Sequence, residues 1–169
     1  MFGCVGAVLR CWAGLALKCA AQGKIPLMHS LTLETDNRGA IALALAGDQW
    51  IVACLCANWC GTCVSYRAAF ERLAARHPDT RFVWIDIEDQ ADVVGELDVE
   101  NFPTLLIQRG DTVAFLGTVL PDAVLAERLL AAQVSNSDEE LARLAASSEQ
   151  RRAWQRLANL RTLLRAAGQ

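Results

Sequence analysis

This sequence has a low net charge, only two histidines and no long apolar run. The 16 basic and 19 acidic residues leave a formal net charge of −3. This gives no electrostatic case for nucleic acid or an anionic membrane as a partner. The two histidines, His29 and His77, have no metal-ligand spacing, so we expect both at the surface and no metal bound by them. No apolar run reaches the roughly 18 residues that a membrane span needs, and we expect no span.

The composition is that of a globular protein. With 169 residues, the chain is slightly longer than one typical domain, and 53% of its residues are hydrophobic. Its seven cysteines, at positions 4, 11, 19, 54, 56, 60 and 63, are odd in number and irregularly spaced. This pattern does not indicate a disulfide framework and favours a reducing compartment. We expect Cys54 and Cys56 to be small core residues.

Residues 1–27 differ from the rest of the chain. They hold three cysteines and both lysines but no acidic residue. A short apolar stretch could act as a weak export signal, but Lys18 stands before Cys19 where a cleavage site needs a small residue. A translation start at Met28 and a short helix lying on the domain are the alternatives. We expect an unimportant or artefactual leader and a cytoplasmic protein, with export as the alternative.

The sequence WCGTC at 59–63 is the most informative motif. It follows the apolar run 50–56 and opens a helical pattern. Two thiols three residues apart at a helix start face the same way, one turn apart. The helix N-terminus offers free N–H groups and partial positive charge, which favour a thiolate on the first cysteine. Cys60 is therefore a candidate nucleophile, and Cys63 is the thiol that can close a disulfide with it.

A second motif, NFPTLLI at 101–107, places Pro103 forty residues after Cys63. With these two motifs the chain resembles the thioredoxin family over roughly residues 30–133. That family carries WCxxC at the start of its second helix and a cis-proline, usually before Thr, at the start of a later strand. The resemblance implies a thioredoxin fold with a cis peptide bond before Pro103.

The resemblance implies a thiol–disulfide oxidoreductase, by default a protein-disulfide reductase that maintains cell redox balance. Cys60 would attack a substrate disulfide, and Cys63 would then attack the Cys60 sulfur and release the reduced substrate. The partners implied are disulfide-bearing client proteins and a thioredoxin reductase, and no cofactor is expected. The implied substrate-binding residues are Trp59, Gly61, Thr62, Phe102 and Pro103.

Several positions depart from the family's pattern. Many thioredoxins have Pro where this chain has Thr62, and that position tunes the redox potential. A buried Asp six residues before the first cysteine, which helps to deprotonate the second cysteine, is replaced by Cys54. A common aromatic residue is replaced by Cys56, and a lysine that pairs with the Asp is replaced by Trp84. We therefore expect slow release of the mixed disulfide.

The remaining pattern predicts a mixed sheet with helices on both faces. The order is β-α-β-α-β-α-β-β-α. We expect strands at 31–35, 50–56, 81–87, 104–108 and 113–117, and helices at 39–46, 64–76, 91–97 and 122–132. This gives a thioredoxin-like domain over 28–133. Residues 138–168 are expected to form a helical extension of one or two helices, whose apolar face packs on that domain or, as the less favoured option, on a second copy.

Two other functions compete with the redox one. Cys54, Cys56, Cys60 and Cys63 could supply four thiolates for zinc or an iron–sulfur cluster. A strand and a helix would have to converge on one ion, and the family's cis-proline tends to block metal there. The other alternative is a binding or chaperone module that uses the C-terminal helix for partners.

Asp86 and Glu88 are expected to be ordinary strand-end residues, although either could replace the missing buried acid.

Overall fold

The computed structural model describes residues 29–168, and its centre is a five-stranded sheet in the order β1-β3-β2-β4-β5. The strands are β1 (Ser30–Thr32), β2 (Trp50–Cys56), β3 (Arg81–Asp86), β4 (Thr104–Arg109) and β5 (Thr112–Thr118). The first three run parallel, whereas β4 is antiparallel to β2 and β5. The expected mixed sheet is confirmed. The expectations for residues 1–27 and for a start at Met28 lie outside the described residues.

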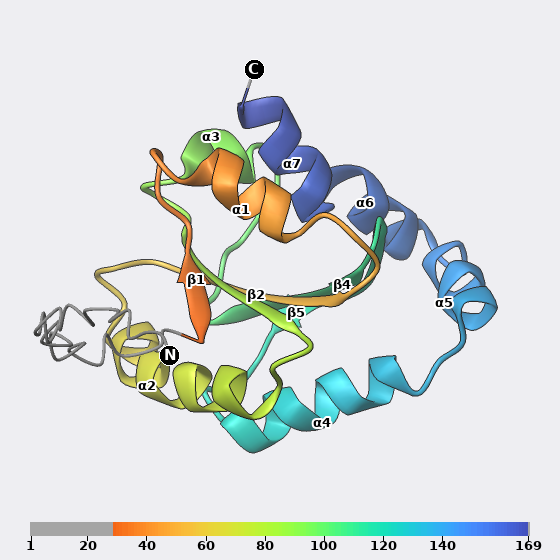
Figure 1. Cartoon of the computed structure of the whole chain (residues 1–169), viewed down its shortest axis with the longest axis horizontal. Helices are drawn as coiled ribbons and strands as arrows, with labels where there is room; N and C mark the ends of the chain where they lie inside the picture. Colours follow the sequence, from red (N-terminus) through yellow and green to blue (C-terminus); the bar gives the residue numbers. More distant parts are fainter. Residues whose placement is uncertain (1–28, 169) are drawn as a thin grey trace, which may run out of the picture.

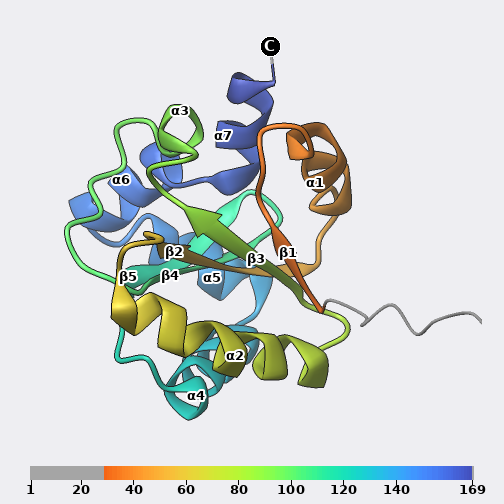
Figure 2. The ribbon, with the colours of Figure 1, turned by 90° about the vertical axis from the view of Figure 1, so that its left-hand side faces the viewer.

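Helices cover both faces of the sheet (Figures 1 and 2). On one face lie α1 (Arg38–Ala44), α3 (Ala91–Val94) and, from the far end of the chain, α7 (Leu160–Ala167). On the other face lie α2 (Gly61–Arg76) and α4 (Ala123–Val134). A separate apolar core fills each of the two layers. This arrangement is the fold that the two motifs imply.

The central strand β2 is buried from Ile51 to Cys56 because both faces of the sheet are covered. Its side chains alternate between the two cores, as the geometry of a strand requires. The core under α1 receives Ile51, Ala53 and Leu55, and the core under α2 receives Val52, Cys54 and Cys56. Both strand cysteines therefore face the layer that contains α2.

Helix α2 carries one apolar face into this layer. Tyr66, Phe70, Leu73 and Ala74 lie on this face and are all buried. Phe70 packs edge-on against the ring of Phe82, with centroids 5.3 Å apart. The helix ends at Arg76, because residues that precede a proline disfavour the helical conformation and Pro78 follows His77.

The C-terminal segment forms three short helices, not the one or two that the sequence predicts. They are α5 (Asp138–Ala145), α6 (Glu149–Leu157) and α7. The side chains of Ser137, Ser148 and Asn159 each accept a backbone N–H at the start of one helix. These caps satisfy N–H groups that a continuous helix would not leave free, which explains the breaks.

The extension packs on the sheet domain, as expected for its apolar face. Leu160 and Leu164 of α7 are 2% exposed and belong to the same core as Ile41 of α1 and Val93 of α3. A buried amide pair fixes the junction. Gln108 of β4 donates to Asn159 at 3.0 Å and accepts from the backbone of Leu160 at 2.9 Å.

Element boundaries differ from the expected ones at a few places. Strand β1 ends at Thr32 rather than residue 35, and α3 ends at Val94, where Gly95 adopts a φ of 60°. Gly110 has a φ of 53° in the turn between β4 and β5, a conformation that glycine adopts without steric cost. Of the two histidines, His29 is exposed and His77 is half-buried beside Glu127.

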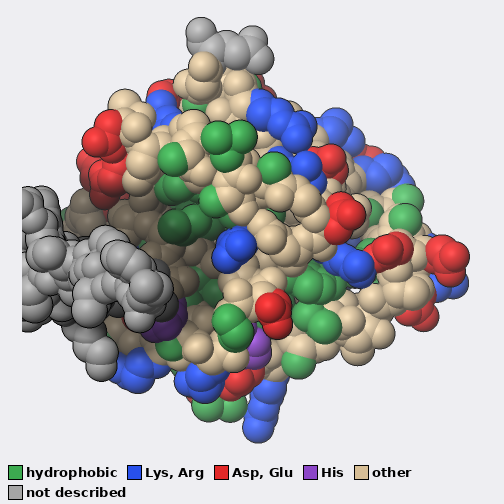
Figure 3. Space-filling model, viewed as in Figure 1, with side chains coloured by type: hydrophobic (Ala, Val, Ile, Leu, Met, Phe, Trp, Pro, Cys, Tyr) green, Lys and Arg blue, Asp and Glu red, His purple; other side chains and the backbone are tan. Residues whose placement is uncertain are grey.

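On the face drawn in Figure 3, basic and acidic side chains are interspersed over the C-terminal helices. Neither sign dominates the described part of this face, in keeping with the low net charge. Among residues 29–168, none of the helices combines the length and the apolar character needed to cross a bilayer.

Candidate active site

The WCGTC motif links the end of β2 to the start of α2, as the sequence predicts. The N–H group of Cys60 donates to the carbonyl of Ala57 at 3.0 Å, which forms a tight turn after the strand. Cys60 is the residue that caps α2, with an extended backbone, and its carbonyl accepts the N–H of Val64 at 3.0 Å. The first turn of the helix contains no acidic residue. No side chain among the described residues caps this end of the helix either, so the unpaired N–H groups of its first turn lie beside Cys60.

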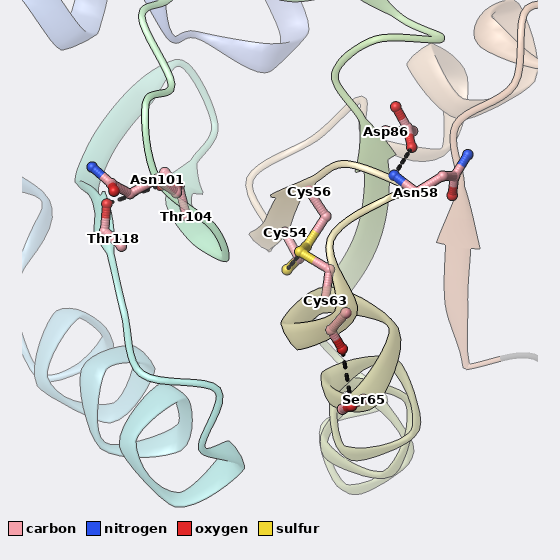
Figure 4. The surroundings of a disulfide bond; sticks show 10 residues. Cys54, Cys56, Asn58, Cys63, Ser65, Asp86, Asn101, Thr104 and Thr118 are labelled. Carbon is pink, nitrogen blue, oxygen red and sulfur yellow. Dashed lines mark hydrogen bonds between the residues drawn. A yellow bond between two sulfur atoms is a disulfide. The ribbon is translucent and has the colours of Figure 1, made fainter.

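Cys63 is bonded to Cys56, not to Cys60 (Figure 4). The two Cα atoms are 6.0 Å apart, and both side chains are 1% exposed. Cys60 is half-buried and, within residues 29–168, is a free cysteine. The structure thus holds a different disulfide from the expected Cys60–Cys63 pair. The physical reason is the alternation along β2, which turns Cys56 toward the first turn of α2, where Cys63 faces inward.

The structure also corrects the expectation that Cys56 is only a small core residue. It is buried, as expected, but it forms a covalent link between the central strand and the active-site helix. The sequence contained one signal for this link. The spacing Cys54-x-Cys56 on a buried strand put both sulfurs on one face, and the following helix had to cover one face or the other.

Cys54 is a buried thiol next to this bond. Its Sγ lies 3.7 Å from the Sγ of Cys56, and its side chain has no exposed surface. Burial raises the pKa of the Cys54 thiol far above its ordinary value, and the nearby Arg67 offsets this only in part. Trp84 pairs with Cys54 across β2 and β3, and the guanidinium of Arg67 lies 4.6 Å from the Trp84 ring centre.

Asp86 and Glu88 contact the loop that leads into the motif. The carboxylate of Asp86, 8% exposed, accepts the backbone N–H of Asn58 at 2.6 Å (Figure 4). It also accepts the N–H groups of Glu88 at 2.9 Å and Asp89 at 3.2 Å. Glu88 accepts the indole N–H of Trp59 at 2.8 Å. Both acids therefore position the loop that leads into the motif, a role that no local sequence pattern indicates.

The NFPTLLI motif lies beside Trp59 of the WCGTC motif. The peptide bond between Phe102 and Pro103 is cis, which confirms the expectation. The rings of Trp59 and Phe102 meet edge to face, with centroids 5.7 Å apart, and Trp59 is 67% exposed. Among the described residues, nothing lies within 4 Å of the place where a side chain at Gly61 would begin. The substrate-binding roles of these residues and of Thr62 stay predictions.

A pocket of about 230 Å³ lies beside the first turn of α2. Cys63 forms part of its wall, together with Asn58, Val64 and Trp84. Val64 is 64% exposed, so the rim of this pocket and Trp59 both present apolar surface to solvent.

Comparison with known proteins assigns the family. Residues 35–130 match the family model described as Thioredoxin. The chain belongs to the thioredoxin family. It is 37% identical over 62 residues to the thioredoxin of Ophiophagus hannah, a match that covers 37% of this chain and 59% of that protein. It is 35% identical over 72 residues to human thioredoxin, covering 43% of this chain and 69% of the relative.

A solved chain from a complex of ferredoxin:thioredoxin reductase with thioredoxin f2 has a similar fold. The TM-score is 0.54 at 20% identity, and the match covers 63% of this chain and 96% of that chain. The stretch shared with the Ophiophagus hannah relative is less than two thirds of that protein's length. The comparisons therefore establish the fold and the family. The chemistry of this chain is argued from the residues of its own site.

The four-cysteine metal site has less support than the redox function when Cys56 and Cys63 are joined in a disulfide. Two of its four sulfur atoms, those of Cys56 and Cys63, are bonded to each other. Across residues 29–168, His, Cys, Asp and Glu side chains form no group of three or more that could hold a metal ion.

Proposed function

We propose that this member of the thioredoxin family is a thiol–disulfide oxidoreductase that reduces protein disulfides through Cys60 and Cys63. One observation carries the proposal. Cys60 is the accessible, free sulfur among the described cysteines and lies at the N-terminus of α2, one turn before a buried cysteine that already takes part in a disulfide. Beside it lie the exposed Trp59 and, on the loop before β4, the cis peptide bond between Phe102 and Pro103, where a substrate chain would approach.

The reaction begins from the form in which both cysteines are reduced. The Cys60 thiolate attacks one sulfur of a substrate disulfide, and the other substrate sulfur leaves as a thiolate and takes up a proton. Cys63 then loses its proton and attacks the Cys60 sulfur. A Cys60–Cys63 bond forms as the mixed disulfide breaks, and the substrate departs with two thiols. One substrate disulfide is reduced for each dithiol oxidised.

The helix N-terminus contributes to the first step. Its unpaired N–H groups and partial positive charge stabilise a developing thiolate at Cys60 without a catalytic base. Trp59 and Phe102 would supply apolar contact to the substrate, and Gly61 leaves room for its backbone. Thr62 stands between the two cysteines and would influence the potential of the pair.

The electron donor and the location belong to the same proposal. A reductase that acts on thioredoxins would regenerate the dithiol, supported by the solved reductase complex whose thioredoxin-like chain resembles this one. We place the protein in the cytoplasm, because the reductive direction needs a supply of reducing equivalents. Recovery of the native protein in an exported fraction would contradict this location.

The direct test is reduction of insulin disulfides with dithiothreitol as donor, followed as turbidity. The wild-type chain should accelerate the reaction well above dithiothreitol alone, and Cys60→Ser should fall to that baseline. Cys54→Ala is the matched control, because it removes a neighbouring buried thiol and should keep most of the rate. A Cys60→Ser variant with the wild-type rate would overturn the proposal and favour a binding role for the fold.

A further inference from the structure

Cys63 has two candidate partners in this site. Cys60 lies one turn before it in sequence, at the tip of α2, and Cys56 lies across from it at the end of β2. The structure contains the bond to Cys56, with a Cα separation of 6.0 Å that falls within the usual disulfide range of about 4.4–6.8 Å. Cys60 packs against the same apolar core as the other two cysteines.

We propose that Cys56 is a third redox-active thiol of this site. After a substrate has oxidised Cys60 and Cys63, Cys56 attacks Cys63 and takes over the disulfide, and Cys60 becomes a free thiol again. This inference rests on the proposed function, because the Cys60–Cys63 bond is the product of substrate reduction.

The exchange balances without any added reagent. The bond between Cys60 and Cys63 breaks as the bond between Cys56 and Cys63 forms. The proton that Cys56 loses ends on Cys60, so nothing is oxidised or reduced overall. The step is therefore an internal isomerisation of a disulfide, and it needs only the three sulfur atoms.

The surroundings of the three cysteines favour this direction. Cys60 is the leaving group, and the N-terminus of α2 stabilises it as it departs with negative charge. The bond that replaces it joins two side chains that are each 1% exposed. An external thiol can hardly reach such a bond, so it persists longer than the exposed pair would.

Cys54 does not take this part, although its sulfur lies 3.7 Å from that of Cys56. In the structure Cys63 is bonded to Cys56, and Cys54 stays a free, buried thiol. Cys54 is therefore a good control position, close to the exchange but outside it.

The exchange has a functional consequence. An ordinary dithiol site has no free thiol once it is oxidised. In this chain the oxidised form would keep an accessible nucleophile at Cys60 while its disulfide is stored in the core. It could then form a mixed disulfide with a second client. Reduction of the stored bond would proceed by the reverse route, with Cys60 attacking Cys63.

The exposed Trp59 allows a sharp test, because it separates the two cysteine pairs in sequence. The reduced full-length chain is mixed with one equivalent of insulin, quenched in acid, blocked with N-ethylmaleimide and cleaved with chymotrypsin. Cleavage after Trp59 puts Cys56 and Cys63 on different peptides, whereas Cys60 and Cys63 stay together up to Tyr66. Mass spectrometry then tells which bond has formed.

We expect peptides 51–59 and 60–66 to be joined through Cys56 and Cys63, with the blocking label on Cys54 and Cys60. In oxidised Cys56→Ser the bond should move to Cys60 and Cys63. Labelling of Cys60 in the native oxidised protein should then fall by at least about tenfold, because a disulfide sulfur does not react with the maleimide. Cys54→Ala should behave as the wild type. Cys60→Ser should acquire no bond from insulin, since the buried cysteines cannot reach the substrate.

One result would overturn the inference while leaving the proposed function in place. It is a wild-type bond only between Cys60 and Cys63, with Cys56 labelled and insulin still reduced. Failure of the proposed function is recognised separately, by a rate of insulin reduction that does not depend on Cys60.

Discussion

The carboxylate of Asp86 connects the end of β3 to the loop that carries the active-site motif, and its removal is a quantitative test of that connection. The Oδ2 atom accepts the N–H of Asn58 at 2.6 Å, and Oδ1 accepts those of Glu88 and Asp89. Asp86→Asn keeps the shape of the side chain. It replaces one accepting oxygen by an NH2 group, so at least one backbone N–H then faces a donor.

The size of the effect follows from these contacts. A hydrogen bond to a charged group contributes about 1.5–3 kcal/mol, and leaving a buried donor unpaired costs about 1–3 kcal/mol. Because Asp86 is 8% exposed, water cannot readily replace the lost oxygen. We expect Asp86→Asn to lower the free energy of unfolding by about 2–3 kcal/mol.

Urea unfolding followed by tryptophan fluorescence, with the disulfide kept oxidised, measures this difference at constant slope. Asp89→Asn is the control, because its exposed carboxylate contacts the side chain of the same Asn58 at 3.1 Å. That change should cost less than about 0.5 kcal/mol. Equal losses in the two variants, or an Asp86→Asn curve that overlays the wild type, would refute the assigned role of Asp86.

Three further predictions concern the extension, an ion pair and the redox cycle. Leu164→Ala should lower the free energy of unfolding in urea by about 2–5 kcal/mol, because Leu164 is 2% exposed in the core, whereas the partly exposed Leu157→Ala should cost far less. The Arg38 guanidinium holds the pKa of the Asp92 carboxyl below its ordinary value, so this pair stabilises the fold above about pH 4 and the contribution is lost as the pH falls through that lowered pKa. In unfolding curves at several pH values, the difference between the wild type and Asp92→Asn should therefore shrink in acid, and a constant difference would contradict the pairing. In stopped-flow reduction of a model disulfide, the Cys63 step should be slower than in human thioredoxin, and an ordinary rate constant would contradict this.

Much of the fold could be predicted from local pattern. The continuous apolar run fixed β2 at Trp50–Cys56, and Pro78 fixed the end of α2. Both features depend on neighbouring residues only. The cis peptide bond before Pro103 followed from family resemblance, because the proline alone does not select it.

The features that were missed depend on distances across the fold. Strand periodicity placed Cys56 on one face, but only the packing of α2 decides that its sulfur meets Cys63 rather than a core carbon. Asp86, at the end of β3, contacts Asn58 in the loop after β2, and no local sequence pattern predicts such a contact. Ser148 and Asn159 are residue types that cap helices, so they could have predicted the helix breaks. The apolar periodicity of the segment favoured longer helices instead.

The central claim is that Cys60 is the attacking sulfur and Cys63 releases the substrate. Incubation of Cys63→Ser with insulin, followed by peptide mapping, tests it most directly. The account predicts a covalent adduct that dithiothreitol reverses, that maps to Cys60 and that the Cys60→Ser, Cys63→Ser double variant does not form. The absence of an adduct, or an adduct on another cysteine in its place, would contradict the account.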